Sequence, residues 1–270
     1  MRKGIAVLPL DSLDAVLSDI GTIGFESEDV TCARLLRWKK KYKNTKFVHT
    51  SGIVEEFRRS KSQDELKKIL KACSITKAVL RLIPRLLLSG ISEKNLAWRI
   101  ESECRKRGAD GMAFETIVGF GEHTSRPHHH PTDRKLRVGD LVQIDMGAKF
   151  DGYCSDYSRV FFTASPTVEQ AKAMKALRTA SNAAKAILKP DVTNRQLDEK
   201  ARSALKSFGY DKEFSHALGH GVGLDIHEGV TLSMKARSRK IKKNEVVTIE
   251  PGLYFEGKWG MRIEETIIVR

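Results

Sequence analysis

The sequence is poor in cysteine and contains no long hydrophobic run. Its four cysteines are scattered and form no C-x-x-C pair, which argues against a thiolate zinc site and predicts reduced thiols in a cytoplasmic protein. Charged residues or proline interrupt the apolar runs well before they reach the length of a membrane span, so we expect no segment to cross a bilayer. The chain starts with basic residues, but the apolar run that follows is short and contains Pro9, so we expect no secretory signal.

Acidic residues are outnumbered by basic ones, 34 against 48, which gives a formal net charge of +14. The densest basic runs, residues 37–46 and 237–243, do not form the interleaved pattern of a recognised RNA-binding motif. We therefore expect a solvated, lysine-rich surface, with neither nucleic acid nor a membrane as partner. At 270 residues, the chain is long enough for one large domain, or for one domain with a small appendage.

The succession of apolar and turn residues predicts an α+β fold. Residues 1–25 form short apolar pieces, whereas residues 63–88 repeat apolar side chains near the helical period, and Pro84 should kink or split that helix. Capping residues, prolines and β-branched stretches place the remaining elements. The predicted helices are 27–42, 63–88, 92–107, 165–188 and 193–209, and the predicted strands are 46–50, 113–121, 140–150, 153–162, 244–255 and 260–269.

The dipeptide Asp151–Gly152 predicts a two-residue hairpin turn. With that turn, position 150 faces 153 and position 147 faces 156. Asp145 then shares a face of the sheet with Asp156, as a diagonal neighbour about 7–8 Å away along the backbone. Two aspartates on one face of a largely apolar hairpin are costly to bury unpaired, so the pairing favours a cation between them.

A second strand pair also carries carboxylates. Glu250 ends the run VVTIE before the Pro251–Gly252 turn, and Glu264 follows Ile263 in RIEET. A glutamate on a strand ordinarily faces solvent. Because alternate residues of a strand face opposite sides, at most one of Glu264 and Glu265 points inward.

Residues 214–229, FSHALGHGVGLDIHEG, bring three histidines and several glycines together. His216 and His220 have the spacing of the zinc motif H-E-x-x-H, but Ala217 occupies the position of its general base, so we reject that motif. The glycines lack the strand-to-helix context of a dinucleotide fingerprint. A lone histidine is more often structural than a ligand, yet one imidazole with several carboxylates makes an oxygen-rich set suited to manganese, cobalt, iron or zinc.

Five motifs, IDMG, CSDYSR, GHGVG, IEPG and RIEET, occur in the order and spacing of the pita-bread metalloaminopeptidase family. Residues 126–162 resemble its proline-specific branch, the Xaa-Pro aminopeptidases and Xaa-Pro dipeptidases (prolidases). The resemblance implies a pita-bread (creatinase/aminopeptidase) catalytic domain over residues 58–270, with an antiparallel sheet and flanking helices. The segment from Ile23 to Ala72 resembles only the last part of the α/β domain that precedes the catalytic domain in relatives, and little precedes this segment. The resemblance therefore implies a truncated creatinase-like N-terminal domain over residues 1–57.

By position, the resemblance implies a dinuclear metal site and a homodimer. Two divalent ions, manganese or else cobalt, zinc or iron, would hold a bridging hydroxide that attacks the Xaa-Pro bond at a peptide N-terminus or in a dipeptide. Glu250 would carry the proton to the leaving nitrogen, while His216 and His227 would handle protons and the oxyanion. The implied metal ligands are Asp145, Asp156, His220, Glu250 and Glu264, and the implied substrate-binding residues are His128, His216, His227 and Arg262.

Some features of the sequence match no role in the resemblance. His129 and His130 correspond to no functional position of the family, so we expect them to be bystanders. The segment GEHTSRPH, residues 121–128, departs from the polar lead-in that usually precedes the histidine at position 128.

Two alternatives compete with a proline-specific peptidase. A methionine aminopeptidase shares the five ligands, but its last motif would place a histidine after the ligand glutamate and would lack the arginine two residues before it, so RIEET favours the proline branch. A non-catalytic binding protein on the same fold is the other alternative. Such relatives have typically lost metal ligands, whereas all five are present in this chain.

Overall fold

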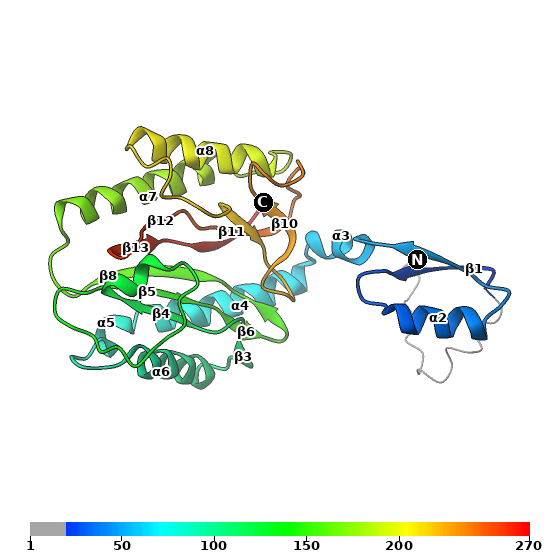
Figure 1. Cartoon of the computed structure of the whole chain (residues 1–270), viewed down its shortest axis with the longest axis horizontal. Helices are drawn as coiled ribbons and strands as arrows, with labels where there is room; N and C mark the ends of the chain where they lie inside the picture. Colours follow the sequence, from blue (N-terminus) through cyan, green and yellow to red (C-terminus); the bar gives the residue numbers. More distant parts are fainter. Residues whose placement is uncertain (1–19) are drawn as a thin grey trace. The chain divides into compact units, whose positions relative to one another are not determined.

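The computed structural model of the protein describes residues 20–270 and divides the chain into two units, Met1–Phe57 and Arg58–Arg270 (Figure 1). The expectations for residues 1–19, including the one on a secretory signal, lie outside the described residues. Within residues 20–270, no helix has both the length and the apolar character needed to cross a membrane.

The described part of the first unit is a small βαβ arrangement. Strand β1 (Thr22–Glu26) pairs in parallel with β2 (Lys46–Thr50), and α2 (Cys32–Lys41) connects them. The predicted strand 46–50 is confirmed. The prediction of a helix from residue 27 is wrong by five residues, because the side chain of Thr31 accepts a hydrogen bond from the Arg34 amide and fixes the start of α2.

The second unit alternates helices with antiparallel strands, as the α+β prediction requires. Helix α3 (Ile53–Arg59) leads into it from the first unit. Its elements are α4 (Gln63–Leu80), α5 (Ile83–Leu86), α6 (Glu93–Lys106), β3 (Gly111–Met112), β4 (Ile117–Phe120), the 3-10 helix η2 (Gly121–Ser125), β5 (Leu141–Met146), β6 (Ala148–Phe150), β7 (Tyr153–Cys154), β8 (Tyr157–Phe162), α7 (Val168–Ile187), α8 (Asn194–Ser207), β9 (Gly219–Gly221), β10 (Glu228–Leu232), β11 (Val246–Ile249), β12 (Gly252–Phe255), β13 (Trp259–Arg262) and β14 (Glu265–Ile268).

Helix boundaries follow the capping residues of the sequence. Reciprocal hydrogen bonds between Thr167 and Gln170 begin α7, and those between Thr193 and Gln196 begin α8, which confirms the helix predicted from residue 193. The predicted split of the helix 63–88 is confirmed, because α4 ends at Leu80 and Pro84 stands in the first turn of α5.

The hairpin register predicted from Asp151–Gly152 is confirmed. Phe150 pairs with Tyr153, and the same register continues to Asp145, which pairs with Ser158. Position 147 therefore faces Asp156, and Asp145 is the diagonal neighbour of Asp156. The strands predicted as 140–150 and 153–162 are each interrupted at this point, so that β5 and β6 are separate, as are β7 and β8.

The C-terminal strands form a second interrupted hairpin. Strand β11 pairs with β14, and β12 pairs with β13, in one continuous register across the turn at Gly257. In that register Glu250 stands opposite Glu264, at the interruption between the two strand pairs. The single strands predicted over 244–255 and 260–269 are thus wrong in their continuity, because each gives up sheet pairing at its carboxylate.

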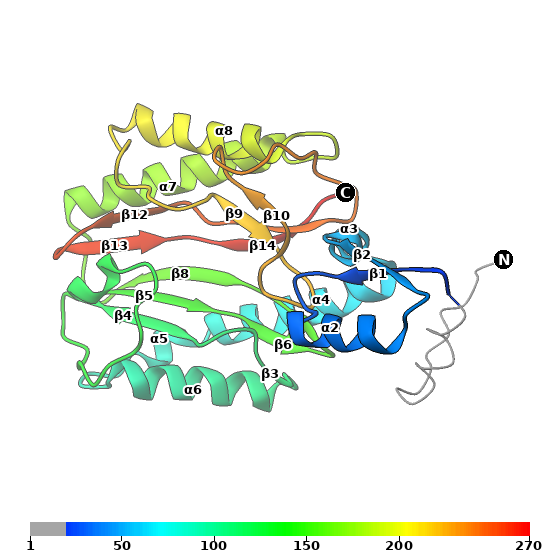
Figure 2. The same cartoon turned by 45° about the vertical axis from the view of Figure 1, so that its right-hand side comes forward.

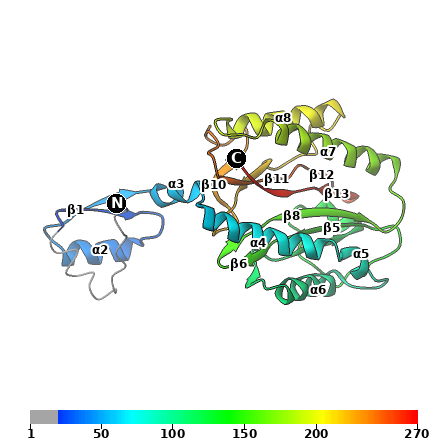
Figure 3. The same ribbon diagram turned by 180° about the vertical axis from the view of Figure 1, so that it is seen from behind.

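Helices cover the strands of the second unit on two sides (Figures 2 and 3). Helices α4 and α6 pack on β3, β4, β6 and β7, and share a hydrophobic core with them. Helix α7 packs on β11, β12 and β13, and α8 packs on α7 and β10, around a second core. The interrupted hairpins lie between these two cores, so the carboxylates at the interruptions are held by rigid elements on both sides.

Candidate metal centre

A single cavity of about 480 Å³ is lined by all nine residues proposed for the site from the sequence. They come from different parts of the second unit: strands β5 and β13, the two hairpin interruptions, β9 and the loops around it, and the loop after η2. Apolar side chains complete the wall. The nine residues are His128, Asp145, Asp156, His216, His220, His227, Glu250, Arg262 and Glu264, and the apolar ones are Phe114, Ile117, Pro127 and Ile226.

Two close backbone contacts shape the site, one at the interruption of the first hairpin and one between β9 and β11. At Gly147 an added Cβ atom would lie 1.9 Å from the carbonyl oxygen of Ser155, so only glycine permits this crossing of strands. At Gly219 a Cβ would lie 2.1 Å from the carbonyl oxygen of Thr248. These crossings bring Asp156 and Glu250 towards His220, the residue after Gly219.

His220 is the only imidazole of the site within 3.5 Å of two carboxylates. Its Nε2 lies 3.5 Å from Oδ2 of Asp156 and 3.4 Å from Oε1 of Glu250. One ligand atom each of Asp156, His220 and Glu264 lie within 4.8 Å of one another. The ring of His227 contacts that of His220, with centroids 4.1 Å apart.

Three of the carboxylates have buried oxygens without a hydrogen-bond partner. Within residues 20–270 these are Oδ1 of Asp145, Oδ1 of Asp156 and Oε1 of Glu264. Buried acceptors are rarely left without a partner, and leaving one costs about 1–3 kcal/mol. Two of the three carboxylates, those of Asp156 and Glu264, cluster with the His220 imidazole, and buried carboxylate oxygens without a partner fit divalent cations, so the donor set suits a metal site.

The pKa values of the clustered carboxyl groups also favour a bound cation. Burial, and next the nearby carboxylates of Asp145 and Glu250, raise the pKa of Asp156 well above its ordinary value. Burial and the Asp156 carboxylate do the same to the pKa of Glu264. Burial raises the pKa of Glu250 to about 7. Full ionisation of the cluster would therefore place more negative charge there than the protein alone compensates, and a bound cation would relieve this.

Arg262 is committed to other protein groups. Its guanidinium contacts the Asp145 carboxylate, and donates to Oγ of Ser158 at 2.9 Å and to the Tyr254 hydroxyl at 2.7 Å. It also donates to the carbonyl oxygen of Pro127 at 3.1 Å. Four of its five N–H groups are thus used by the protein, which leaves one for a substrate.

His216 is neutral and its tautomer is fixed by its neighbours. Nδ1 lies 2.7 Å from the carbonyl oxygen of Ala217, which only accepts, so Nδ1 carries the proton. Nε2 then accepts from the Tyr254 hydroxyl at 3.0 Å. Burial, followed by the charge of Arg262, lowers the pKa of His216 to about 3, and burial also lowers the pKa of His227.

Sequence reasoning missed three residues that hold the ligands in place. The hydroxyl of Ser158 donates to Glu264 at 2.9 Å, and the hydroxyl of Thr248 donates to Glu250 at 3.3 Å. Tyr254 joins Arg262 to His216. A signal was present, because Ser158 and Thr248 each lie two residues from a ligand and therefore share its face of the strand.

The remaining sequence predictions concern the neighbours of the ligands. Glu264 is buried, whereas Glu265 is partly exposed and pairs with Arg159 and Lys185, so the prediction that only one points inward is confirmed. His130 is exposed and lies 3.1 Å from the surface residue Glu115. His129 is buried against Glu93, away from the cavity.

Two interrupted hairpins that bring four carboxylates to one cavity, with helices on either side, form the pita-bread arrangement. Residues 67–270 match the model of metallopeptidase family M24, and residues 4–60 match the creatinase/prolidase N-terminal domain. The chain therefore belongs to metallopeptidase family M24, and it is a peptidase.

Its relatives include proline-specific enzymes. The chain is 34% identical over 260 residues to an Xaa-Pro dipeptidase of Pyrococcus furiosus, a match that covers 96% of this chain and 74% of that one. Among solved structures, it is similar to an X-Pro aminopeptidase from Thermotoga maritima, with a TM-score of 0.90, 35% identity, and coverage of 96% and 74%. It is also similar to the prolidase from Pyrococcus furiosus, with a TM-score of 0.89, 31% identity, and coverage of 98% and 78%.

Proposed function

We propose that the protein hydrolyses the bond between a first residue and a following proline, at the N-terminus of peptides or in dipeptides. The supporting observation is the convergence of five ligand-type side chains, three of them with unsatisfied buried oxygens, in one cavity with an apolar wall. The relatives named as Xaa-Pro dipeptidase and X-Pro aminopeptidase support the choice of substrate.

We propose Asp145, Asp156, His220, Glu250 and Glu264 as the ligands of two divalent ions. Such ions lower the pKa of a bound water and polarise the substrate carbonyl. Glu250 is the proton carrier in this proposal, because its carboxylate lines the cavity beside the other proposed ligands, 3.4 Å from Nε2 of His220. It would take a proton from the attacking water and return it to the leaving nitrogen.

The histidines and Arg262 position the substrate in this proposal. His227 and His128 line the cavity beside the ligands and would donate to the oxygen of the scissile carbonyl as charge develops on it. His216 holds the Tyr254 hydroxyl, and Arg262 holds Asp145 and retains one N–H for a substrate carboxylate or carbonyl. Arg262 therefore mainly positions Asp145, and its remaining N–H would bind the substrate.

Selectivity for proline would come from shape. An Xaa-Pro bond has no N–H, so no hydrogen bond from the substrate nitrogen distinguishes it. Phe114, Ile117 and Ile226 offer apolar surface to a pyrrolidine ring, and burying a ring of that size contributes about 1–3 kcal/mol.

We propose manganese as the metal, because carboxylates outnumber imidazoles four to one in the ligand set and oxygen-rich sites suit hard ions. We propose a cytoplasmic protein, because its four cysteines are unpaired and three of them are buried as thiols. A homodimer, and residues 1–57 as a creatinase-like domain, complete the proposal. Sedimentation measures whether the protein is a dimer. Expression of residues 58–270 alone tests whether residues 1–57 form a separate domain.

The metal-ligand assignment is tested by Asp156→Asn and His220→Asn. Each should reduce metal-dependent hydrolysis of an Xaa-Pro peptide by more than about 100-fold and release metal measured by elemental analysis. Asp133→Asn is the matched control, because Asp133 is exposed and pairs only with Lys94 at the surface. Full activity in the two ligand variants would overturn the assignment.

A further inference from the structure

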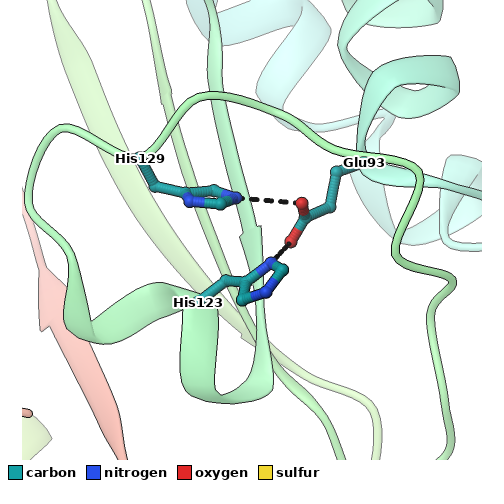
Figure 4. Close-up of side chains that lie close together, drawn as sticks. All are labelled: Glu93, His123 and His129. Carbon is teal, nitrogen blue, oxygen red and sulfur yellow. Dashed lines mark hydrogen bonds and ion pairs between the residues drawn. The ribbon is translucent and has the colours of Figure 1, made fainter. Parts of the chain in front are cut away.

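A second cluster of metal-ligand side chains lies outside the cavity. Glu93, at the first position of α6, faces His123 from η2 and His129 from the loop that follows, and both rings turn towards the one carboxylate (Figure 4). Nδ1 of His123 lies 2.9 Å from Oε1, and Nε2 of His129 lies 2.9 Å from Oε2. None of the three residues lines the cavity of the proposed metal centre.

The carboxylate of Glu93 is fixed and ionised. It is fully buried, and it accepts hydrogen bonds from the Phe120 amide at 2.8 Å, the Thr132 amide at 2.9 Å and the Thr132 hydroxyl at 2.6 Å. These bonds and the one from His129 outweigh its burial and lower the pKa of Glu93 to about 2. Backbone and hydroxyl donors of this kind orient the carboxylate ligands of metal sites, and a ligand must be deprotonated to bind.

The three groups have the spacing that a tetrahedral ion needs. One ligand atom from each lies within 4.8 Å of the other two, and the two rings are 4.6 Å apart between centroids. Ligand atoms about 2.0–2.1 Å from a zinc ion are about 3.3 Å from one another, and each ring nitrogen now lies 2.9 Å from its own oxygen of Glu93, which is close to that spacing. The ion would take the place of the two ring protons that now point at Glu93.

We propose that Glu93, His123 and His129 form a further divalent-cation site of the two-histidine, one-carboxylate type, which takes zinc. Two imidazoles and one carboxylate are softer donors than the carboxylate-rich cavity, so the site should prefer zinc to manganese. The side chain of His123 is 19% exposed, which gives the ion a path and leaves a fourth position for water. His128 precedes His129, so an ion here ties the start of α6 to the loop that carries a residue of the cavity.

The site predicts a zinc count that the cavity alone does not explain. Metal-free protein is dialysed against zinc, and bound zinc per chain is measured by native mass spectrometry. The double variant His123→Asn, His129→Gln should bind one zinc fewer than wild type. The Asn and Gln amides keep a donor at the positions of Nδ1 and Nε2, so the hydrogen bonds to Glu93 are preserved and only the metal ligands are lost.

Two controls separate this site from the cavity. His130→Asn changes the neighbouring exposed histidine and should keep the wild-type count. The variant Asp156→Asn, His220→Asn removes proposed cavity ligands and should still lose one further zinc when His123 and His129 are also changed. The proposal thus succeeds or fails independently of the proposed function. An unchanged zinc count in the His123, His129 variant would overturn it.

A measurement on the unaltered chain covers the case in which that variant does not fold. Crystals of wild-type protein soaked in zinc should show anomalous scattering at a point between Nδ1 of His123, Nε2 of His129 and the Glu93 carboxylate. The absence of that peak, with zinc seen in the cavity, would show that the cluster is a hydrogen-bonded network only and would contradict the proposal.

Discussion

Buried carboxylates of this protein differ in what compensates their charge. Glu93 accepts five hydrogen bonds, and its pKa falls to about 2. Asp156 and Glu264 are equally buried, but each has an oxygen without a partner and a second carboxylate nearby, and the pKa of each rises. The carboxylate charge is thus compensated by protein donors at Glu93 and is left uncompensated at Asp156 and Glu264.

The hydrogen bonds to Glu93 should make stability depend on pH in acid. Unfolded Glu93 binds a proton at a higher pH than folded Glu93, so its contribution is present above pH 5 and is lost as the pH falls towards 2. The pKa difference corresponds to about 3 kcal/mol. Urea unfolding of wild type and Glu93→Gln should differ by roughly that amount at pH 7, and the difference should shrink in acid. Glu115→Gln, at an exposed site, is the control. A pH-independent difference would contradict the assignment.

Ser158 should be a positioning residue for the metal ligands. Its hydroxyl accepts from Arg262 and donates to Glu264, both buried. Ser158→Ala leaves both groups short of a partner, and we expect metal affinity to fall by about 10–100-fold. Isothermal titration with manganese measures this, and Ser207→Ala on the surface of α8 is the matched control. A variant with unchanged affinity but lower stability would show that Ser158 is structural only.

Among the elements, the site depends on two hairpins that are each interrupted at a carboxylate, where Gly147 stands opposite Asp156 and Glu250 stands opposite Glu264. The chain crosses closely at Gly147 and Gly219, and the carboxylates after the crossings leave the sheet for the cavity. Rigid strands on either side of each interruption hold the ligands in place without a long loop.

Replacement of Gly147 should disrupt the first interruption. The Cβ of Gly147→Ala would lie 1.9 Å from the Ser155 carbonyl oxygen, so the strands must move apart. We expect a loss of about 1–3 kcal/mol or more in the free energy of unfolding, measured with urea, together with weaker metal binding. Gly111→Ala is the control, because a Cβ there has no neighbour within 4 Å. Equal stability of the two variants would contradict this account of the crossing.

Much of this architecture was predictable from local sequence. Asp151–Gly152 fixed the register that sets Asp145 diagonal to Asp156, and capping residues placed the starts of α7 and α8. The interruptions were not predictable, because they depend on contacts between strands far apart in the chain. The cluster of Glu93, His123 and His129 was not predictable either, because it depends on the packing of α6 against β4. From the sequence alone we expect His129 to be a bystander, whereas in the structure it contacts Glu93.

At the scale of the molecule, metal should couple the two cores of the second unit. The proposed ligands come from hairpins that pack on different helices, so an ion that binds only the folded state stabilises both. At a metal concentration of 100 times the dissociation constant, the free energy of unfolding rises by about 2.7 kcal/mol. For a unit of this size, that raises the melting temperature by about 5–10 °C.

The stability gained from metal binding should also depend on pH. The raised pKa values of Asp156, Glu250 and Glu264 mean that metal displaces protons from the site, so the gain should decline as the pH falls below 7. Differential scanning calorimetry with and without manganese, at pH 7.5 and pH 5.5, measures this. Asp133→Asn should behave as wild type and Asp156→Asn should show no gain. A gain that is equal at both pH values would contradict the account.

We propose that the enzyme uses this cluster of carboxylates and histidine, with metal bound, to cleave the bond before proline. The direct measurement offers manganese-loaded protein an Xaa-Pro dipeptide, an Xaa-Pro-Xaa tripeptide and a Met-Ala-Ser peptide, and follows the products by mass spectrometry. We predict cleavage of one or both proline peptides, and none without metal. Cleavage of the dipeptide alone would indicate a prolidase, and cleavage of the tripeptide an aminopeptidase. Cleavage of only the methionine peptide, or of none while metal is bound, would contradict the claim.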